Sequence, residues 1–285
     1  MLMNYYRHID RDQVQFDFLC NKTKPGAYDD EIQRMGGKIY HTPGLNPAKY
    51  PLYLKYMKKL FDGHPEYKIV EAHNGALGVY ALHAAKVNNI PVRIYHAHGA
   101  SITKDWKLPL KLFCRSRLTA NITERYTCGK AAAECYYGKE VVEKGNYDFI
   151  PNAIEVDRFL YNPQVRDKMR QQYHLEGKHV IGHVGRFMAQ KNHTFLLDVF
   201  AAYKDAYLVL LGDGELMDTV KNKAKELGVA DSVLFVGNVG NANEWYQAFD
   251  VFMLPSIWEG LPVVGVEAQA ADLPCIFSDN VTKEI

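Results

Sequence analysis

The sequence has few of the features that mark secreted, zinc-bound or membrane-spanning proteins. Five of its 285 residues are cysteines and no two of them form a Cys-x-x-Cys pair, which favours neither a disulfide framework nor a zinc site. No apolar run approaches the roughly 20 residues that span a bilayer, and no charged-then-apolar leader opens the chain. We therefore expect a reducing, cytoplasmic setting, which still allows peripheral contact with a membrane.

An excess of charge of either sign is also missing. The chain has 34 Lys and Arg against 33 Asp and Glu, for a net charge of +1, so nothing in the overall electrostatics favours nucleic acid or a strongly acidic partner. Any basic site must be local. With 47% hydrophobic residues over this length, the chain can form two domains with buried cores.

Short apolar runs alternate with segments of helical period and predict an α/β fold. The expected strands lie at 14–19, 68–73, 92–98, 179–185, 207–214, 233–237, 250–256 and 274–279. The expected helices lie at 76–89, 192–204 and 214–228, and Gly228 is suited to a helix C-cap. Strands that alternate with helices predict parallel sheets covered on both faces.

The stretch FIPNAIEVDRF, at 149–159, predicts a domain boundary. A strand-like piece meets Pro151 and Asn152, and a polar, charged stretch follows to about residue 175. The interpretation is two α/β domains, 1–151 and 152–285, each a doubly wound sheet. Such sheets bind ligands beyond the carboxyl ends of their strands, so the residues at strand ends are the functional candidates.

The segment GRFMAQKNH places two cations after an expected strand. Arg186 follows Gly185 directly, and Lys191 stands at the expected start of a helix. A guanidinium fork, an ammonium and the amides of a helix N-terminus suit a diphosphate. A solvated basic turn is the alternative that the motif alone leaves open.

Two glycine turns follow the next expected strands. In LGDGE, Gly212 and Gly214 allow close backbone approach, and a tight turn is the favoured interpretation for Asp213. The third glycine of a dinucleotide fingerprint is missing, so an NAD-dependent oxidoreductase is disfavoured. The GRFMAQKNH segment is also not a Walker A loop. In FVGNVGN, the backbone of Gly237, Asn238 and Val239 could contact a base edge.

The segment EGLPVVGVE holds two carboxylates eight positions apart. Glu259 is expected in a loop and Glu267 about a turn and a half inside a helix that begins near Pro262, at most about 12 Å away along the axis. Paired glycosidase carboxylates stand about 5–9.5 Å apart, so this pair suits instead the two rings that flank a diphosphate. A capping acid and a solvated helix residue are the alternative roles.

In this order and spacing, IPNAIEVDRF, GRFMAQKNH, LGDGE, VLFVGNV and PSIWEGLPVVGVEAQA resemble the GT-B glycosyltransferases of family 4, of the bacterial exopolysaccharide and capsule type. The resemblance covers nearly the whole chain. It implies two Rossmann-like domains that face across a cleft, with 1–151 binding the acceptor and 152–285 binding the nucleotide sugar. It also implies transfer from a nucleotide-diphosphate sugar, UDP-linked by preference, to a saccharide or lipid-linked acceptor.

The resemblance assigns roles to single residues. It implies that Glu259 contacts hydroxyls of the donor sugar and acts at the catalytic centre, that Glu267 binds the ribose, and that Arg186 and Lys191 bind the diphosphate. The remaining donor-binding candidates are Gly260, Leu261 and Pro262 at the helix start, with Gly237, Asn238 and Val239.

The resemblance further implies a reaction that retains the anomeric configuration and uses no metal or other cofactor. Cations and helix ends would then neutralise the leaving group. The metal-binding Asp-x-Asp motif of the other large transferase fold has one match, Asp10-Arg11-Asp12, which precedes the first expected strand. A solvated turn is the interpretation for this match.

Histidines mark two expected strand ends in the first domain. His96 and His98, in RIYHAHGAS, lie two residues apart and therefore on one side of a strand. The resemblance implies one active-site histidine here, with His98 the first choice and His96 the second. A hydrogen-bonded core histidine is the alternative for either. His73 could line the acceptor cleft or be structural.

The segment KDWKLPLKLFCRSRL, at 104–118, mixes basic residues with large apolar ones. A basic amphipathic helix of this kind can lie on an anionic membrane surface, here the inner face of the cell membrane, whereas a solvated helix face is the alternative. Its cations are Lys104, Lys107, Lys111, Arg115 and Arg117.

Compared with the family pattern, both domains are expected to be incomplete. The preceding strand with its glycine-rich loop is missing at the start, where MLMNYYRHIDR suggests the first helix, and the final strand and helices are missing after FSDNVTKEI. Two other functions stay open: a nucleotide-sugar epimerase of GT-B fold, and a non-catalytic protein that binds nucleotide sugars.

Overall fold

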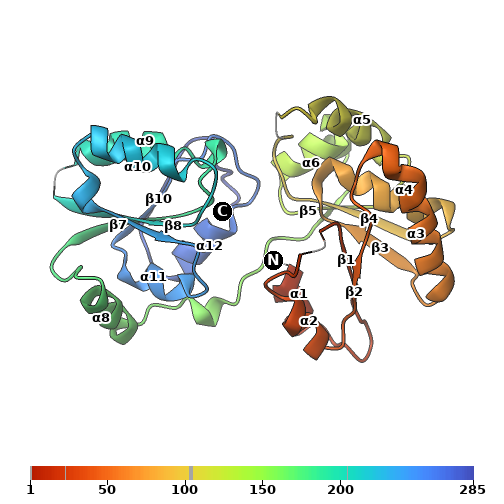
Figure 1. Ribbon diagram of the computed structural model, residues 1–285, viewed down its shortest axis with the longest axis horizontal. Helices are drawn as coiled ribbons and strands as arrows, with labels where there is room; N and C mark the ends of the chain where they lie inside the picture. The colour runs from red at the N-terminus through yellow and green to blue at the C-terminus, as the bar shows by residue number, and fades with distance from the viewer. Residues whose placement is uncertain (1, 23, 103–104, 204) are drawn as a thin grey trace. The chain divides into compact units, whose positions relative to one another are not determined.

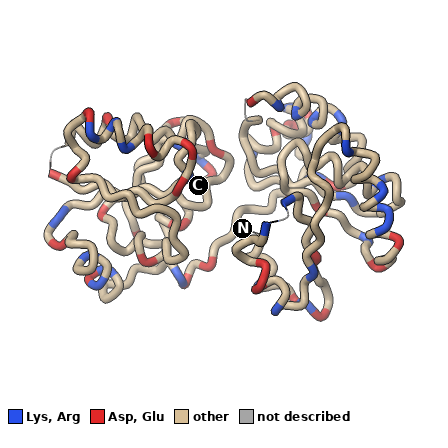
Figure 2. The backbone as a smooth tube through the Cα atoms, viewed as in Figure 1, with Lys and Arg blue, Asp and Glu red and all other residues tan. Residues whose placement is uncertain are grey.

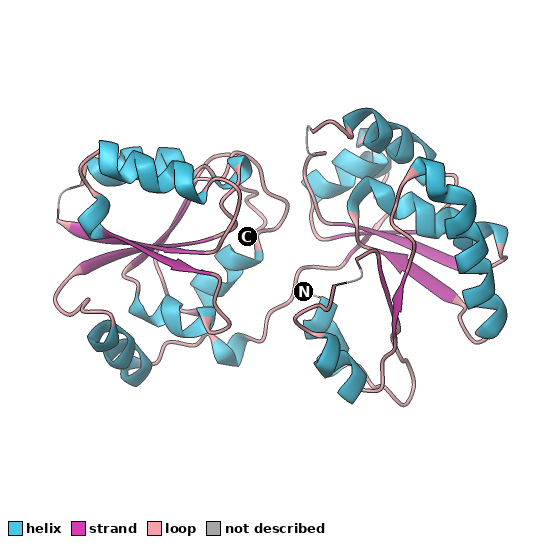
Figure 3. Cartoon of the chain, in the orientation of Figure 1, coloured by secondary structure: helices cyan, strands magenta, loops and turns pink. Residues whose placement is uncertain are grey.

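The computed structural model describes residues 2–22, 24–102, 105–203 and 205–285. The chain forms two compact units, Leu2–Pro151 and Asn152–Ile285 (Figure 1). In each unit helices pack beside parallel sheets (Figure 3). All strand pairs of the described residues are parallel, which confirms the predicted α/β class.

The unit Asn152–Ile285 contains a five-stranded sheet in the order β11-β10-β7-β8-β9. Its strands are β7 His179–Val184, β8 Ala206–Leu211, β9 Val233–Gly237, β10 Val251–Leu254 and β11 Cys275–Phe277. Its α-helices are α8 Pro163–Gln172, α9 His193–Ala201, α10 Met217–Glu226, α11 Ala242–Ala248 and α12 Val263–Ala270. Helices α9 and α10 cover one face of the sheet, and α8, α11 and α12 lie on the other (Figure 1).

The side chains of β8 point alternately into two hydrophobic cores, one on each face of the sheet. Leu208 and Leu210 point into the core shared with α9 and α10, whereas Val209 and Leu211 point into the core shared with α8, α11 and α12. All four side chains are buried. A strand covered on both faces must be apolar at every position, which is why β8 appears in the sequence as one continuous apolar run.

The unit Leu2–Pro151 contains a four-stranded sheet in the order β3-β4-β5-β6 and a separate two-stranded pair, β1-β2. The strands are β1 Phe18–Cys20, β2 Ile39–His41, β3 Ile69–Ala72, β4 Val92–Ala97, β5 Glu124–Thr127 and β6 Asp148–Phe149. The α-helices are α1 Leu2–His8, α2 Asp29–Arg34, α3 Tyr50–Gly63, α4 Val79–Val87, α5 Leu108–Leu118, α6 Lys130–Tyr137 and α7 Lys139–Glu143.

Sequence periodicity located most of the strands and several of the helices. Seven of the eight expected strands overlap an observed strand closely, and the three expected helices contain α4, α9 and α10. Gly228 has φ +68° and follows the end of α10, as predicted for a C-cap residue. The expected strand at 14–19 was largely wrong, because only its last two residues belong to β1. Of the four residues before them, Val14 and Gln15 are exposed and Phe16 and Asp17 are half-buried.

Sequence periodicity did not predict the elements that are short or polar. Strands β2, β5 and β6 are two to four residues long, and β5 begins with charged residues. Helix α8 lies in the polar stretch before residue 175, where Asn162 caps it by accepting a hydrogen bond from the Val165 amide at 3.1 Å. Asp10 and Asp12 lie in an exposed turn after α1, as expected.

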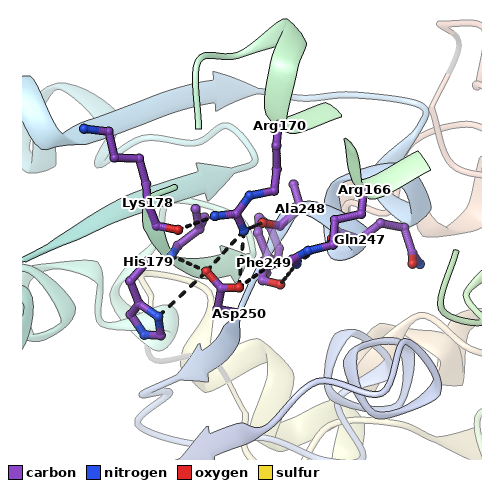
Figure 4. A network of polar contacts seen from close by, with 9 residues as sticks. Arg166, Arg170, Lys178, His179, Gln247, Ala248, Phe249 and Asp250 are labelled. Carbon is purple, nitrogen blue, oxygen red and sulfur yellow. Dashed lines mark hydrogen bonds and ion pairs between the residues drawn. The ribbon is translucent and has the colours of Figure 1, made fainter. Parts of the chain in front are cut away.

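A polar network fixes the amino end of the second sheet. Asp250, just before β10, accepts hydrogen bonds from the Val180 amide at 2.7 Å and from Arg170 at 3.2 Å, and it also pairs with Arg166 (Figure 4). Both arginines lie on α8. The network therefore ties α8 to the starts of β7 and β10, at the end of the sheet opposite the loops described next.

Candidate functional site

The loops at the carboxyl ends of β7, β8, β9 and β10 carry the residues that the sequence singles out. Gly185 and Arg186 follow β7, the LGDGE turn follows β8, Gly237 ends β9, and the loop after β10 leads into α12. In a parallel sheet these four ends share one edge, so the fold brings the motifs together.

Backbone contacts hold the first three loops against one another. The Gly185 amide donates to the Leu211 carbonyl at 2.9 Å, and the Gly212 amide donates to the Gly237 carbonyl at 2.8 Å. Gly212 has φ +129°, and a Cβ there would lie 2.1 Å from the Gly185 carbonyl oxygen. Gly214 is equally confined, because its Cβ would lie 2.4 Å from the Phe187 oxygen. The glycines thus let two loops approach each other closely.

A pocket of about 350 Å³ opens at this edge. Its lining includes Arg186 from the loop after β7 and Asp213 from the turn after β8. The backbone turn of Gly237, Asn238 and Val239 completes it. The structure therefore brings one of the two predicted cations together with the predicted base-contacting turn.

Arg186 is exposed and has an anionic neighbour that the sequence analysis missed. Its guanidinium donates to Glu215 Oε2 at 3.1 Å, and both side chains are more than half exposed. An exposed pair of this kind contributes little to stability and exchanges partners easily. Asp213 caps its own turn by accepting from the Gly214 amide at 2.7 Å, in line with the favoured interpretation.

Lys191 and Glu259 contact each other directly. Lys191 Nζ lies 2.7 Å from Glu259 Oε1, and Gln190 Nε2 donates to Glu259 Oε2 at 3.1 Å. The exposed fractions of the Lys191 and Glu259 side chains are only 14% and 8%. Lys191 ends the short 3₁₀ helix Ala189–Lys191 that precedes α9, near the expected helix start. From the sequence we assigned these two residues to different parts of the ligand and did not expect them to pair with each other.

Helix α12 begins at Val263, directly after Pro262, as the sequence predicted. The loop before it is anchored, since the Asn152 side chain donates to the Leu261 carbonyl at 2.8 Å and Leu261 and Pro262 are buried. Gly260 in the same loop is half-buried. The N-terminus of α12 is thereby held in place beside Glu259.

Glu267 lies inside α12 and is oriented by a tyrosine. The Tyr246 hydroxyl donates to Glu267 Oε2 at 2.9 Å, and the Tyr246 side chain is fully buried. Burial raises the pKa of Glu267 above its ordinary value, although the Tyr246 hydrogen bond opposes this shift. The carboxylate is therefore a positioned acceptor rather than a solvated helix residue.

The three singled-out histidines of the other unit form one cluster. The His96 and His98 rings stack with their centroids 4.2 Å apart, which confirms that they lie on one side of the strand end. His73 Nδ1 lies 2.9 Å from His98 Nε2. His96 is only 3% exposed, whereas His73 and His98 are half-buried.

Glu71 joins this cluster and was missed by the sequence analysis. Its Oε1 lies 3.1 Å from His96 Nδ1 and 3.3 Å from His73 Nε2. Burial alone would raise the pKa of Glu71, but the His96 hydrogen bond and the nearby imidazoles lower it below its ordinary value. Burial lowers the pKa of His73. The sequence did contain a signal for this cluster. The motifs Glu71-x-His73 and His96-x-His98 stand at the ends of adjacent strands, and residues two apart on a strand project to the same side.

Helix α5 carries the predicted mixture of basic and apolar side chains, although Lys104 lies outside the described residues. Trp106 is 86% exposed, and Leu112 and Phe113 are also exposed. Lys107 and Arg117 lie over the rings of Trp106 and Phe113. Elsewhere positive and negative residues are interspersed (Figure 2). Among the described helices, none combines the length and apolar character needed to cross a bilayer.

Comparisons with known proteins agree on one family. Residues 165–283 match the family described as Glycosyl transferases group 1. The chain is 36% identical over 293 residues to EpsF of Bacillus subtilis (strain 168), which is named as a glycosyltransferase; the match covers 100% of this chain and 76% of EpsF.

Two further relatives extend this similarity. The chain is 29% identical to the UDP-Gal:alpha-D-GlcNAc-diphosphoundecaprenol alpha-1,3-galactosyltransferase of Escherichia coli, covering 95% of this chain and 73% of that protein. The structure of Anabaena HepE in complex with UDP-glucose superposes with a TM-score of 0.75 at 19% identity, covering 93% of this chain and 80% of that one. The second comparison concerns the fold alone.

Proposed function

The chain belongs to the group 1 glycosyltransferases and has their GT-B fold, and from this premise we propose that it transfers a sugar from a UDP-sugar to a saccharide or lipid-linked acceptor during cell-surface polysaccharide assembly. The E. coli relative is named for a UDP-galactose donor and a diphosphoundecaprenol-linked acceptor. The observation that carries the proposal is that the loops at one edge of the second sheet hold Arg186 and the Lys191–Glu259 pair, and that Glu267 lies in the helix that begins at this edge.

In the proposed donor complex, each part of the nucleotide sugar has its own partner. The base lies against Gly237, Asn238 and Val239, and Glu267 accepts hydrogen bonds from the ribose hydroxyls. This assignment is supported by the pocket that the backbone turn lines and by the hydrogen bond that orients Glu267. A carboxylate accepts two hydroxyl donors well, which suits a ribose diol.

The diphosphate lies between Arg186, Lys191 and the start of α12. Arg186 exchanges its exposed partner Glu215 for phosphate oxygens, which is supported by the solvent exposure of that pair. Lys191 keeps Glu259 as a neighbour, so that the ammonium and the carboxylate stand where the diphosphate meets the sugar. Glu259 then binds sugar hydroxyls while Lys191 neutralises phosphate charge.

The proposed chemistry is retention of the anomeric configuration without a metal at the diphosphate. As the glycosidic bond to the phosphate breaks, negative charge develops on the leaving UDP. Arg186, Lys191 and the amides at the start of α12 stabilise that charge electrostatically, which removes the need for a cation. The two positive charges in the loop after β7 and the position of the start of α12 support this part of the proposal.

We assign the acceptor to the unit Leu2–Pro151, with His98, and as second choice His96, as the histidine that acts on the transferred sugar. The same unit carries the basic and apolar surface of α5. The exposed Trp106, just before α5, and the exposed Phe113 on α5 support peripheral contact with the inner face of an anionic membrane, where a lipid-linked acceptor would reside.

The test is a transfer assay with several UDP-sugars and a lipid-diphosphate saccharide acceptor, run in a chelator-containing buffer. UDP release that requires the acceptor, together with an NMR spectrum in which the product keeps the donor's anomeric configuration, is expected. Donor epimerisation without acceptor would instead indicate the epimerase, and nucleotide binding without turnover would indicate a non-catalytic protein. Glu259→Gln should abolish transfer, whereas Lys225→Ala, an exposed change on α10, should leave the rate unaltered.

A further inference from the structure

The histidine cluster has the composition of a metal site. One ring nitrogen each from His73, His96 and His98 lies within 4.8 Å of the others. A tetrahedral zinc site with bonds of about 2.0–2.1 Å has ligand nitrogens about 3.4 Å apart, so an ion would draw the wider pairs of nitrogens together and push the narrowest pair apart. All three residues lie at neighbouring strand ends, which are rigid supports for ligands.

Glu71 determines which nitrogens face the centre of the cluster. Its carboxylate contacts His96 Nδ1 and His73 Nε2, which leaves His96 Nε2 and His73 Nδ1 on the other sides of their rings. Metal-bound histidines commonly direct their second nitrogen to a carboxylate in this way, and the carboxylate fixes the tautomer and raises the basicity of the ligand.

His96 supplies a second, independent indication. Its Nε2 is buried and has no hydrogen-bond partner among the described residues. Leaving a buried polar atom without a partner is unfavourable, and such atoms are rare unless an unseen group satisfies them. A bound cation would satisfy His96 Nε2, and it would also separate His73 Nδ1 from His98 Nε2, which now face each other at 2.9 Å.

We propose that His73, His96 and His98 bind one divalent transition-metal ion, with Glu71 holding two of the rings. Three imidazoles suit zinc and its neighbours in the first transition series rather than magnesium or calcium, which prefer oxygen ligands. Three protein ligands leave a fourth position open, and that position would take an oxygen ligand, either water or a saccharide hydroxyl.

Binding requires the rings to turn, because the His96 and His98 planes are now within 28° of parallel. His98 follows the end of β4 and is half-buried, so its ring is less enclosed than that of His96. The site lies wholly within the unit Leu2–Pro151 and differs in kind from a metal at the diphosphate. The proposal therefore holds whether or not the chain transfers a sugar.

The test measures metal binding directly on the whole, tag-free chain after treatment with a chelator. Zn²⁺ is titrated in competition with a chromophoric chelator, and Co²⁺ is added separately to record the visible absorption of a four-coordinate ion. We expect one ion per chain. His98→Asn should weaken Zn²⁺ binding at least 100-fold and abolish the Co²⁺ bands, and Glu71→Gln should weaken binding about 10- to 100-fold.

His174→Asn is the matched control. His174 is exposed and has φ +56°, a conformation that asparagine also accepts, so this variant should bind Zn²⁺ as the parent chain does. Circular dichroism establishes that each variant is folded. We choose His98→Asn as the ligand variant because His98 is only half-buried, whereas replacement of the buried His96 could prevent folding. Absence of stoichiometric Zn²⁺ binding by the parent chain, or equal binding by folded His98→Asn, would overturn the proposal.

Discussion

Lys191 Nζ and Glu259 Oε1 lie 2.7 Å apart although the residues are separated by 68 positions in the chain. The contact joins the loop after β7 to the loop after β10, two neighbouring strands of the same sheet. It places a positive and a negative charge, both nearly buried, at the point where we locate the bond between diphosphate and sugar. The same pair therefore supports the fold of the loops and the binding of the donor.

Removal of one charge of this pair should destabilise the protein strongly. Loss of one partner of a buried ion pair typically costs about 3–5 kcal/mol, because the other charge stays buried without compensation. We expect Lys191→Met to lower the free energy of unfolding by that order in urea denaturation. The double variant Lys191→Met/Glu259→Gln should lose clearly less than the sum of the two single variants. Additive losses would show that the two side chains do not interact in solution.

The glycine turn after β8 should tolerate no side chain. In Gly212→Ala, the added Cβ would meet the Gly185 carbonyl oxygen at 2.1 Å, and the φ of +129° is itself unfavourable for alanine. We expect a loss of at least about 2 kcal/mol and weaker nucleotide binding. Gly240→Ala is the control, because a Cβ there has nothing within 4 Å. Similar thermal midpoints for the two variants would contradict the observed packing of the loops.

Stability should fall as the pH drops below neutrality because two histidines are buried as neutral rings. Burial lowers the pKa of His193 to about 4, and the neighbouring Lys191 shifts it in the same direction. Burial and His193 also lower the pKa of His183. Since each unfolded histidine titrates near 6.5, the unfolded state binds more protons between about pH 6.5 and 4. Stability is therefore full above pH 6.5 and declines as the pH falls toward 4.

For His193 alone, the expected loss between pH 7.5 and pH 5 is roughly 2 kcal/mol. Urea denaturation at the two pH values measures it, and His193→Gln should reduce the difference by about this amount. The informative quantity is the difference in the free energy of unfolding between the two pH values, not its absolute size. The variant can also lose packing against Phe187, whose ring stacks on His193 with the centroids 4.1 Å apart, and that loss lowers stability at both pH values. Equal pH dependence in both proteins would mean that His193 is not buried as a neutral ring.

The surface around α5 should mediate binding to anionic lipid vesicles. Replacement of Lys104, Lys107, Lys111, Arg115 and Arg117 by glutamine should abolish pelleting with such vesicles, since each juxtamembrane cation contributes about 1 kcal/mol. Five exposed lysines elsewhere, Lys55, Lys58, Lys59, Lys168 and Lys225, provide a control of equal charge. Unchanged pelleting of the first variant would make this surface an ordinary solvated helix face.

Much of the fold could be predicted from the sequence because buried parallel strands are continuous apolar runs and the helices between them have a clear period. Strand β8 is such a case. Strand β5, which starts with Glu124, and helix α8, which is mostly polar, lack that signal, and their formation depends on neighbours that are distant in sequence. The local sequence pattern does not show these contacts between residues that are distant in the chain.

The candidate site, like the fold, was only partly predictable from the sequence. Strand ends and glycine turns showed which loops meet, but the sequence did not show that Lys191 pairs with Glu259 or that Tyr246 orients Glu267. Both pairings join residues 21 or more positions apart and depend on loop conformation. Glu71 could have been recognised, since it stands two residues before His73 on a strand that pairs with the strand of His96.

Calorimetric titration with UDP, GDP and ADP in chelator-containing buffer tests the proposed donor site most directly. We predict that UDP binds, that Arg186→Ala and Glu267→Ala each weaken its binding at least tenfold, and that Lys225→Ala does not change it. A folded chain that binds none of the three nucleotides, or whose affinity is the same in all three variants, would contradict the assignment of the donor site to this edge of the sheet.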